Sequence, residues 1–350
     1  MKTGRRTSGL GEKKPPKYPP VKELSEALST VLRQNGYIDG DVAVLERKPN
    51  PLGSTFPTEV VTIRPYGGGR TLRLFVKYGT KKFDHVYGHK GNVSYEARVY
   101  REVLQPLRTS APRLYGVYME NTFNSPWLIV EYLTRGSPAG ASRDPKAMVS
   151  SAQWIGNFHA ANAKRVNSPR LKFLHRYGSK YYAGWVHRTR RLFDQPRLRM
   201  RFPWIAPLCD EFEKLIPRLT EPPQTVIHGE YFGSNIVYQN GIARPVDWQS
   251  AAIAPGEIDL ASVTHSWPKL IVQNCEREYV RARWPRGASE GFEEKLGVAR
   301  VYMNLRWLGD PGLMSPALTR QRKPFVTNSV LLAMQVVLNL HSVGERLGLL

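Results

Sequence analysis

The chain has 350 residues, with 51 Lys and Arg against 29 Asp and Glu, which gives a formal net charge of +22 and a pI near 10.1. This length favours two packed lobes over a single core. The charge favours anionic partners without choosing among nucleotides, phosphorylated metabolites, nucleic acids and acidic membrane surfaces. The two cysteines, Cys209 and Cys275, form no metal-spaced cluster, which predicts a reducing, cytoplasmic location. No stretch reaches the roughly 18 apolar residues of a membrane span, so we expect none.

The predicted elements change character near residue 133. Residues 1–20 are rich in Lys, Arg, Gly and Pro, which predicts a disordered basic tail. A helical pattern then covers 21–35, followed by strands over 41–47, 59–64 and 71–78, a helix over 93–104, and strands over 113–118 and 127–133. Helical patterns dominate afterwards, over 146–162, 178–192, 205–219, 259–267, 273–284, 289–308 and 328–347, with short strands at 235–238 and 243–246. We predict an α+β fold, with a five-stranded antiparallel lobe over 21–133 and a mainly helical lobe over 134–350.

The most informative stretch runs from Thr225 to Asp259 and contains a polar loop and a predicted hairpin. Asn235 and Asp247 lie at the two ends of that hairpin, so their side chains can converge. An amide oxygen and a carboxylate near one point suit Mg²⁺, which completes its shell with water and phosphate. Glu230, five residues before Asn235, can lie beside that metal and face a substrate hydroxyl.

These residues resemble the aminoglycoside phosphotransferase and choline kinase family, which has the protein-kinase fold. The family pattern of His-Gly-Asp, then Asn, then Asp-Trp stands here as HGEYFGSN and DWQ. The resemblance implies a two-lobed fold and a reaction that uses ATP and Mg²⁺ to phosphorylate a small-molecule hydroxyl. Glu230 would orient or deprotonate the acceptor, and Asn235 and Asp247 would hold the metal. His228 and Asp259 would be structural residues of the loop. Glu230 stands where the family commonly has Asp, and its extra methylene moves the carboxylate by about a bond length.

The first half of the chain adds elements of the same resemblance in the expected order. The run LFVKYG places Lys77 in the third predicted strand, where the family has its phosphate-binding lysine. Glu96, on the following helix, is the best candidate for the glutamate that pairs with this lysine in the family. Two other interpretations stay open: Lys77 as an edge-strand lysine that discourages aggregation, and Glu96 as a surface acid.

Two further segments of the nucleotide-binding lobe follow from the resemblance. The run WLIVEYL resembles the hinge, so the backbone of Glu131, Tyr132 and Leu133 would hydrogen-bond the adenine. The turn PNPLGSTFP would lie over the phosphates, with Ser54 and Thr55 supplying hydroxyl and amide groups.

The segment from Lys164 to Arg201 carries twelve Lys or Arg and one acid, Asp194, with aromatic residues between them. In the family this region builds the acceptor-binding face, and it could equally be a solvated basic face. Such a charge repels polycationic aminoglycosides, so we expect an anionic acceptor instead.

Two other functions stay open. The chain could bind ATP without consuming it, because Glu230 departs from the family pattern. It could also bind a nucleic acid or another polyanion, although no nucleic-acid-binding motif is present. The segment with Asp84, His85 and His89 is interpreted as a flexible lid near the nucleotide rather than as a metal site, and His159 as a packing residue.

Overall fold

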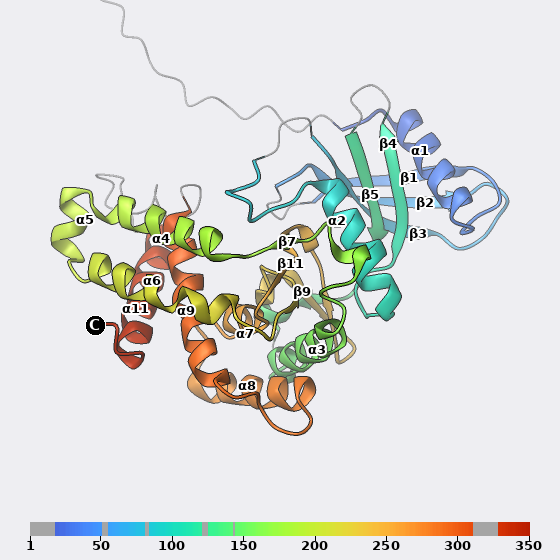
Figure 1. Cartoon of the computed structure of the whole chain (residues 1–350). Helices are drawn as coiled ribbons and strands as arrows, with labels where there is room; N and C mark the ends of the chain where they lie inside the picture. The colour runs from blue at the N-terminus through green and yellow to red at the C-terminus, as the bar shows by residue number, and fades with distance from the viewer. Residues whose placement is uncertain (1–17, 51–54, 81–83, 121–124, 143, 311–327) are drawn as a thin grey trace, which may run out of the picture. The chain divides into compact units, whose positions relative to one another are not determined.

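The computed structural model of the chain describes residues 18–50, 55–80, 84–120, 125–142, 144–310 and 328–350 (Figure 1). By its contacts the chain divides into two compact units, Met1–Lys81 with Tyr115–Tyr132 and Lys82–Leu114 with Leu133–Leu350. The sequence grouped residues 21–133 in one lobe, whereas residues 82–114 cluster with the second unit. The functional division into two lobes stays a prediction.

The first unit is built on one five-stranded antiparallel sheet with the order β1-β2-β3-β5-β4. β1, β2 and β3 form the predicted meander, and β5 pairs with β3. The strand bounds are β1 Val42–Pro49, β2 Thr58–Pro65, β3 Leu72–Tyr78, β4 Leu114–Glu120 and β5 Ser125–Glu131.

One helix, α1 (Val21–Gln34), supplies the other half of the core of this unit. Its Leu24, Leu28 and Leu32 recur at helical spacing and are fully buried in a cluster with sheet residues such as Val61 and Leu74. Residues 1–17 of the predicted tail lie outside the described residues. The described part is packed, because the Tyr18 hydroxyl donates to the Thr58 carbonyl at 3.2 Å.

The second unit is mainly helical. α3 packs against α8, and α9 packs against α4, α7 and α11. The described helices are α2 Val93–Val99, α3 Lys146–Ala163, α4 Ser179–Phe193, α5 Pro196–Arg201, α6 Ile205–Thr220, α7 Glu257–Val263, α8 Lys269–Arg283, α9 Phe292–Gly309 and α11 Asn328–Arg346. The helix predicted over 93–104 is α-helical only to Val99, and a π-helical turn, Tyr100–Leu104, completes it. The sequence missed α5 because its short run of arginines has no apolar period.

Two small sheets of the second unit frame the polar loop. One has the order β10-β9-β6 and the other the order β7-β11-β8. Their strands are β6 Ser137–Pro138, β7 His175–Arg176, β8 Thr225–Ile227, β9 Ile236–Gln239, β10 Ile242–Pro245 and β11 Ala252–Ala254. The β8–β9 connection carries Glu230, and the β10–β11 connection carries Asp247.

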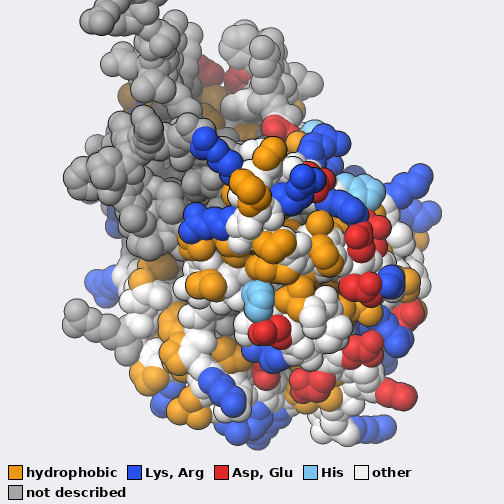
Figure 2. All heavy atoms as spheres, turned by 90° about the vertical axis from the view of Figure 1, so that its left-hand side faces the viewer, with side chains coloured by type: hydrophobic (Ala, Val, Ile, Leu, Met, Phe, Trp, Pro, Cys, Tyr) orange, Lys and Arg blue, Asp and Glu red, His pale blue; other side chains and the backbone are white. Residues whose placement is uncertain are grey.

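Part of the basic segment over 164–201 packs into the core, because several of its aromatic side chains are buried. Tyr182, Trp185 and Phe193 of α4 are buried, and the Arg188 guanidinium lies 3.4 Å from the centre of the Tyr87 ring. On the face shown in Figure 2, Lys and Arg side chains are interspersed with Asp and Glu around a hydrophobic centre. Within the described ranges, no helix is both long and apolar enough to cross a membrane.

Candidate active site

The β8–β9 loop requires glycine at its start. Gly229 has a φ of +83°, and a Cβ on it would lie 2.1 Å from the Ser250 carbonyl oxygen. Only glycine combines this backbone conformation with so close an approach. The Phe232 amide then donates to the Glu230 carbonyl, and the Asn235 amide donates to the Phe232 carbonyl, both at 2.8 Å. These turns fix the direction in which Glu230 and Asn235 leave the backbone.

A buried carboxylate from α7 holds the start of this loop. Asp259 is fully buried and accepts from the amides of His228 at 2.6 Å and Gly229 at 2.9 Å. His159 Nε2 lies 3.1 Å from the same carboxylate. Three donors thus converge on Asp259, which satisfies a charge that would otherwise be costly to bury.

The anchor continues through side chains whose contacts the sequence did not reveal. Burial lowers the pKa of His159, so its imidazole is neutral at pH 7. With the proton on Nε2, His159 donates to Asp259, and its Nδ1 accepts from the Tyr279 hydroxyl at 3.0 Å. Arg283 donates to the same hydroxyl and pairs with Glu257 at 3.0 Å. His159 is therefore more than the packing residue that the sequence suggested.

His228 joins the two polar connections. Its Nε2 donates to the Val246 carbonyl at 2.9 Å, which leaves Nδ1 to accept from the Glu230 amide at 3.3 Å. The ring also lies 4.5 Å, centre to centre, from the indole of Trp248. One histidine thus links the backbone next to Glu230 with the backbone next to Asp247.

The β9–β10 hairpin brings Asn235 and Asp247 to the same end. Ile236 pairs with Pro245, and the Val246 amide donates to the Asn235 carbonyl at 2.9 Å. Asp247 has the left-handed conformation, with φ +65° and ψ +63°. Asp adopts this conformation more readily than most residues other than glycine, and residues in such conformations are enriched at functional sites.

An amide oxygen and a carboxylate at one hairpin end fit Mg²⁺, which needs few protein ligands when phosphates supply the rest. Within the described ranges, no three or more His, Cys, Asp and Glu side chains form a metal-binding group, as zinc would require. Glu96 of α2 reaches the neighbouring backbone, where it accepts from the Trp248 amide at 3.2 Å.

The Glu230 carboxylate lies among basic groups that the sequence missed. It is 12% exposed and lies 3.3 Å from His89 Nε2, 3.5 Å from Lys90 Nζ and 3.5 Å from Arg306 Nη1. Burial alone would raise the pKa of Glu230. The His89 contact and the charges of Arg306 and Lys90 outweigh that effect and hold the pKa well below its usual range. Glu230 is therefore ionised at pH 7.

His89 is fixed rather than mobile. Burial, together with the charge of Arg306, lowers the pKa of His89 to about 4. Its Nδ1 lies 3.0 Å from the Tyr177 hydroxyl and 2.9 Å from the Tyr181 hydroxyl, which leaves Nε2–H facing Glu230. The interpretation of this segment as a flexible lid near the nucleotide is wrong at His89, because the histidine is 1% exposed and packs on α4.

The position of Arg306 in the sequence indicates that it is buried. It lies in α9 within the apolar run VYMNLRWL and is only 3% exposed in the structure. A charge inside an apolar helix needs a buried partner, and here the partner is Glu230.

Lys77 belongs to the first unit, whereas the groups described above belong to the second. It is 4% exposed on β3, between Thr58 of β2 and Leu128 of β5. Because β3 is the central strand, the interpretation of Lys77 as an edge lysine is wrong. Its pairing with Glu96 stays a prediction.

The hinge prediction needs one adjustment. β5 ends at Glu131 rather than Leu133, and the Tyr132 amide donates to the Arg73 carbonyl at 3.2 Å. That amide is therefore engaged within the sheet, so adenine recognition would depend on the other backbone groups of this segment. Thr55 is an exposed residue before β2, and Ser54 lies outside the described residues.

Comparison with known proteins bears on the family and the fold of the chain. Residues 68–291, more than half of the chain, match the model of the phosphotransferase enzyme family. No curated protein matches the chain in sequence.

Three solved structures illustrate the likeness in fold. A provisionally assigned aminoglycoside phosphotransferase from Ralstonia eutropha JMP134 has 13% identity and a TM-score of 0.64 over 91% of this chain and 98% of its own. A choline/ethanolamine kinase family protein from Mesorhizobium loti has 15% identity and a TM-score of 0.58 over 94% and 96%. A spectinomycin phosphotransferase in complex with ADP and spectinomycin has 10% identity and a TM-score of 0.61 over 95% and 100%. The predicted two-lobed, kinase-like fold class is confirmed.

Proposed function

The chain belongs to the phosphotransferase enzyme family, and on that premise we propose that it transfers the γ-phosphoryl group of ATP to a hydroxyl of a small molecule. The acceptor oxygen forms a bond to the γ-phosphorus, the bond to the bridging oxygen breaks, ADP leaves and the hydroxyl proton is released. The observation that carries this proposal is the loop fixed by Asp259. It presents Glu230 and Asn235 next to the hairpin end that bears Asp247.

Asn235 and Asp247 would hold Mg²⁺, which neutralises phosphate charge when it is bound. Lys77 would pair with the phosphates and Glu96 with Lys77, and the backbone near Glu131 would bind the adenine. These roles follow from the family pattern and from the buried position of Lys77.

Glu230 would orient the acceptor hydroxyl rather than keep its proton. Because the His89 contact and the charges of Arg306 and Lys90 hold the pKa of Glu230 low, the carboxylate accepts a hydrogen bond well but is a weak base. Positioning and charge neutralisation supply most of the catalysis in phosphoryl transfer, so a weak base is compatible with turnover.

The charge around Glu230 also bears on the acceptor. Lys90 and Arg306 approach this one carboxylate, which leaves an excess of positive charge. A polycationic acceptor would be repelled there. The acceptor is therefore a neutral or anionic molecule.

A second function has its own observation. A nucleotide-binding protein that performs no transfer would tolerate a Glu230 committed to internal contacts, and Glu230 does contact His89, Lys90 and Arg306.

Neither proposed function includes binding of a nucleic acid. The free, buried thiols of Cys209 and Cys275 support a reducing, cytoplasmic location.

Thermal unfolding with and without MgATP tests the nucleotide site. Asp247→Asn is the informative variant, because Asn tolerates the left-handed backbone of Asp247. The wild type is expected to gain about 2.7 kcal/mol at a hundredfold excess over Kd, and the variant much less. Asp210→Asn removes a half-exposed carboxylate elsewhere and serves as the matched control. A wild type that MgATP does not stabilise would contradict both functions, and label transfer from ATP would separate them.

A further inference from the structure

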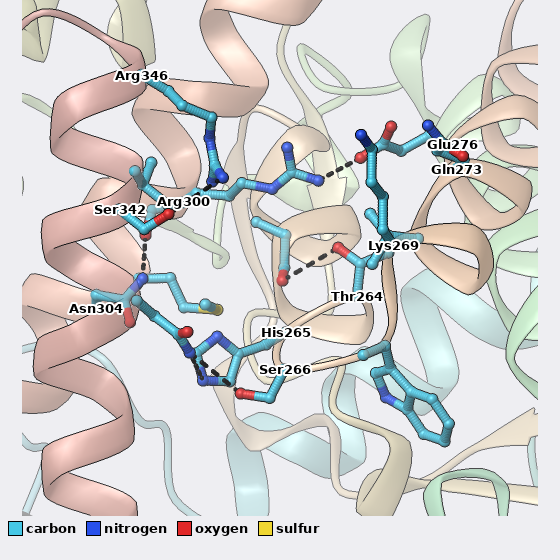
Figure 3. A pocket seen from close by; sticks show the side chains of 16 residues that line it. Thr264, His265, Ser266, Lys269, Gln273, Glu276, Arg300, Asn304, Ser342 and Arg346 are labelled. Carbon is cyan, nitrogen blue, oxygen red and sulfur yellow. Dashed lines mark hydrogen bonds and ion pairs between the residues drawn. The ribbon is translucent and has the colours of Figure 1, made fainter.

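A cavity of about 510 Å³ opens in the second unit, between α8, α9, α11 and the segment that follows α7 (Figure 3). None of the predicted site residues lines it. Its polar lining comes from segments more than 70 residues apart in sequence, such as His265 and Asn339, which only the tertiary fold brings together. None of the residue roles proposed above involves this cavity.

The charge of the lining is positive. Lys269 from α8, Arg300 from α9 and Arg346 from α11 all line the cavity, against one acid, Glu276. Glu276 is already paired with Arg300. Within the described ranges, Lys269 and Arg346 make no ion pair, and Arg346 donates only to the Ser342 hydroxyl at 3.3 Å. Two cations are thus left without a counter-charge beside the same hollow, which attracts an anion and repels a cation.

The opposite end of the cavity offers hydrogen bonds instead of charge. In Figure 3, the guanidinium groups of Arg300 and Arg346 lie toward one end, and His265 and Ser266 lie toward the other. Burial lowers the pKa of His265 to about 4, so its imidazole is neutral at pH 7. Asn339 Nδ2 lies 3.1 Å from Ser266 Oγ and 3.4 Å from His265 Nε2.

Asn304 adds a buried acceptor. It is 1% exposed, and its Nδ2 donates to the Arg300 carbonyl at 2.8 Å. Its Oδ1 has no hydrogen-bond partner among the described residues. A buried amide oxygen left unpaired is costly, so a donor such as a ligand hydroxyl would stabilise it. Met303 and Val272 complete the lining with apolar surface.

We propose that this cavity binds a small organic anion, with a phosphate or carboxylate group at Lys269 and Arg346 and a hydroxylated body toward His265 and Asn304. An aromatic row connects the cavity with the candidate active site. The His265 ring lies 4.9 Å from the Trp307 ring, and Trp307 lies 5.0 Å from Phe232, two residues after Glu230. The ligand is therefore either the acceptor or an effector that acts on this loop.

Isothermal titration of the nucleotide-free protein tests the proposal with three sugars of one ring size: glucose 6-phosphate, glucose and glucosamine. The double variant Lys269→Ala/Arg346→Ala should weaken binding of glucose 6-phosphate about tenfold. Both side chains are exposed, so folding is not at risk. Arg281→Ala, on the same helix as Lys269 but 80% exposed and outside the cavity, is the control and should bind like the wild type.

Preference for glucose 6-phosphate over both other sugars, lost in the double variant, would support the site. Equal binding of the three sugars, or a double variant that binds like the wild type, would overturn it. So would a failure of glucose 6-phosphate, citrate and inorganic phosphate all to bind.

This test does not depend on phosphoryl transfer, because no ATP is present. Labelled ATP added afterwards distinguishes the two sources of the ligand. Label transferred to the bound anion identifies it as the acceptor, and binding without label transfer identifies an effector.

Discussion

The exchange Asp259→Asn tests how the polar loop is held. It keeps the size of the side chain but replaces one carboxylate oxygen by an NH₂ group. If Oδ1 of the new amide keeps the His228 amide and His159, its Nδ2 must face the Gly229 amide, donor against donor. One hydrogen bond to a charged acceptor is lost, at a cost of about 1.5–3 kcal/mol. The two that remain become hydrogen bonds to a neutral acceptor and weaken.

We therefore expect Asp259→Asn to reduce the free energy of unfolding by about 2–3 kcal/mol in urea titrations. Asp210→Asn changes the same atoms at the surface, where the ion pair with Arg190 is half-exposed, and should cost under about 1 kcal/mol. The contrast between the two variants separates a buried anchor from a general loss of negative charge.

Amide hydrogen exchange measures the same anchor locally. A loss of about 2 kcal/mol corresponds to roughly thirtyfold faster opening at the amides of His228 and Gly229. Unchanged exchange at these two amides, with a stability within about 0.5 kcal/mol of the wild type, would refute the account of the loop.

Two further predictions follow from the same site. Gly229→Ala should reduce the free energy of unfolding by more than about 3 kcal/mol in urea titrations, because the new Cβ would meet the Ser250 carbonyl. The control Gly241→Ala has a similar φ of +79° but open space around it, so it should cost only about 1 kcal/mol. Equal losses in the two variants would exclude the contact with Ser250 as the cause. The pKa of His89 is about 4 in the folded state and near 6.5 in the unfolded state. The unfolded state therefore binds more protons, and stability falls as the pH drops from 6.5 toward 4. Between pH 8 and pH 5 the wild type should lose about 2 kcal/mol more than His89→Gln, and parallel pH profiles would contradict a neutral, buried His89.

Much of the fold could be predicted from the sequence because local patterns of apolar residues determine many of its helices and strands. The apolar period of α1 and the alternation in β2 and β3 locate these elements within one or two residues. The same holds for the candidate site where it is contiguous. Glu230, Asn235 and Asp247 lie within one short stretch whose spacing matches a family pattern.

The rest depends on pairings between distant parts of the chain. Arg306 contacts Glu230 from α9, and His89 contacts it from the segment before α2. No local sequence pattern predicts either contact. The sequence does indicate that Arg306 is buried. Arg306 lies in an apolar helix, which indicates a buried partner without naming it. Likewise, Asp259 was identified as a structural residue, but its contact with His159 was not, nor was the Tyr279 hydroxyl that bonds His159 in turn.

The most direct test of the proposed function is label transfer from γ-labelled ATP to a panel of neutral and anionic hydroxyl compounds, followed by ³¹P NMR of the product. The account predicts a phosphate ester that forms with the wild type and Mg²⁺, and that is lost with a chelator or in Asp247→Asn. A wild type that binds MgATP but labels no acceptor would favour the nucleotide-binding alternative. Transfer that proceeds unchanged in Asp247→Asn would contradict the metal site at the centre of the proposal.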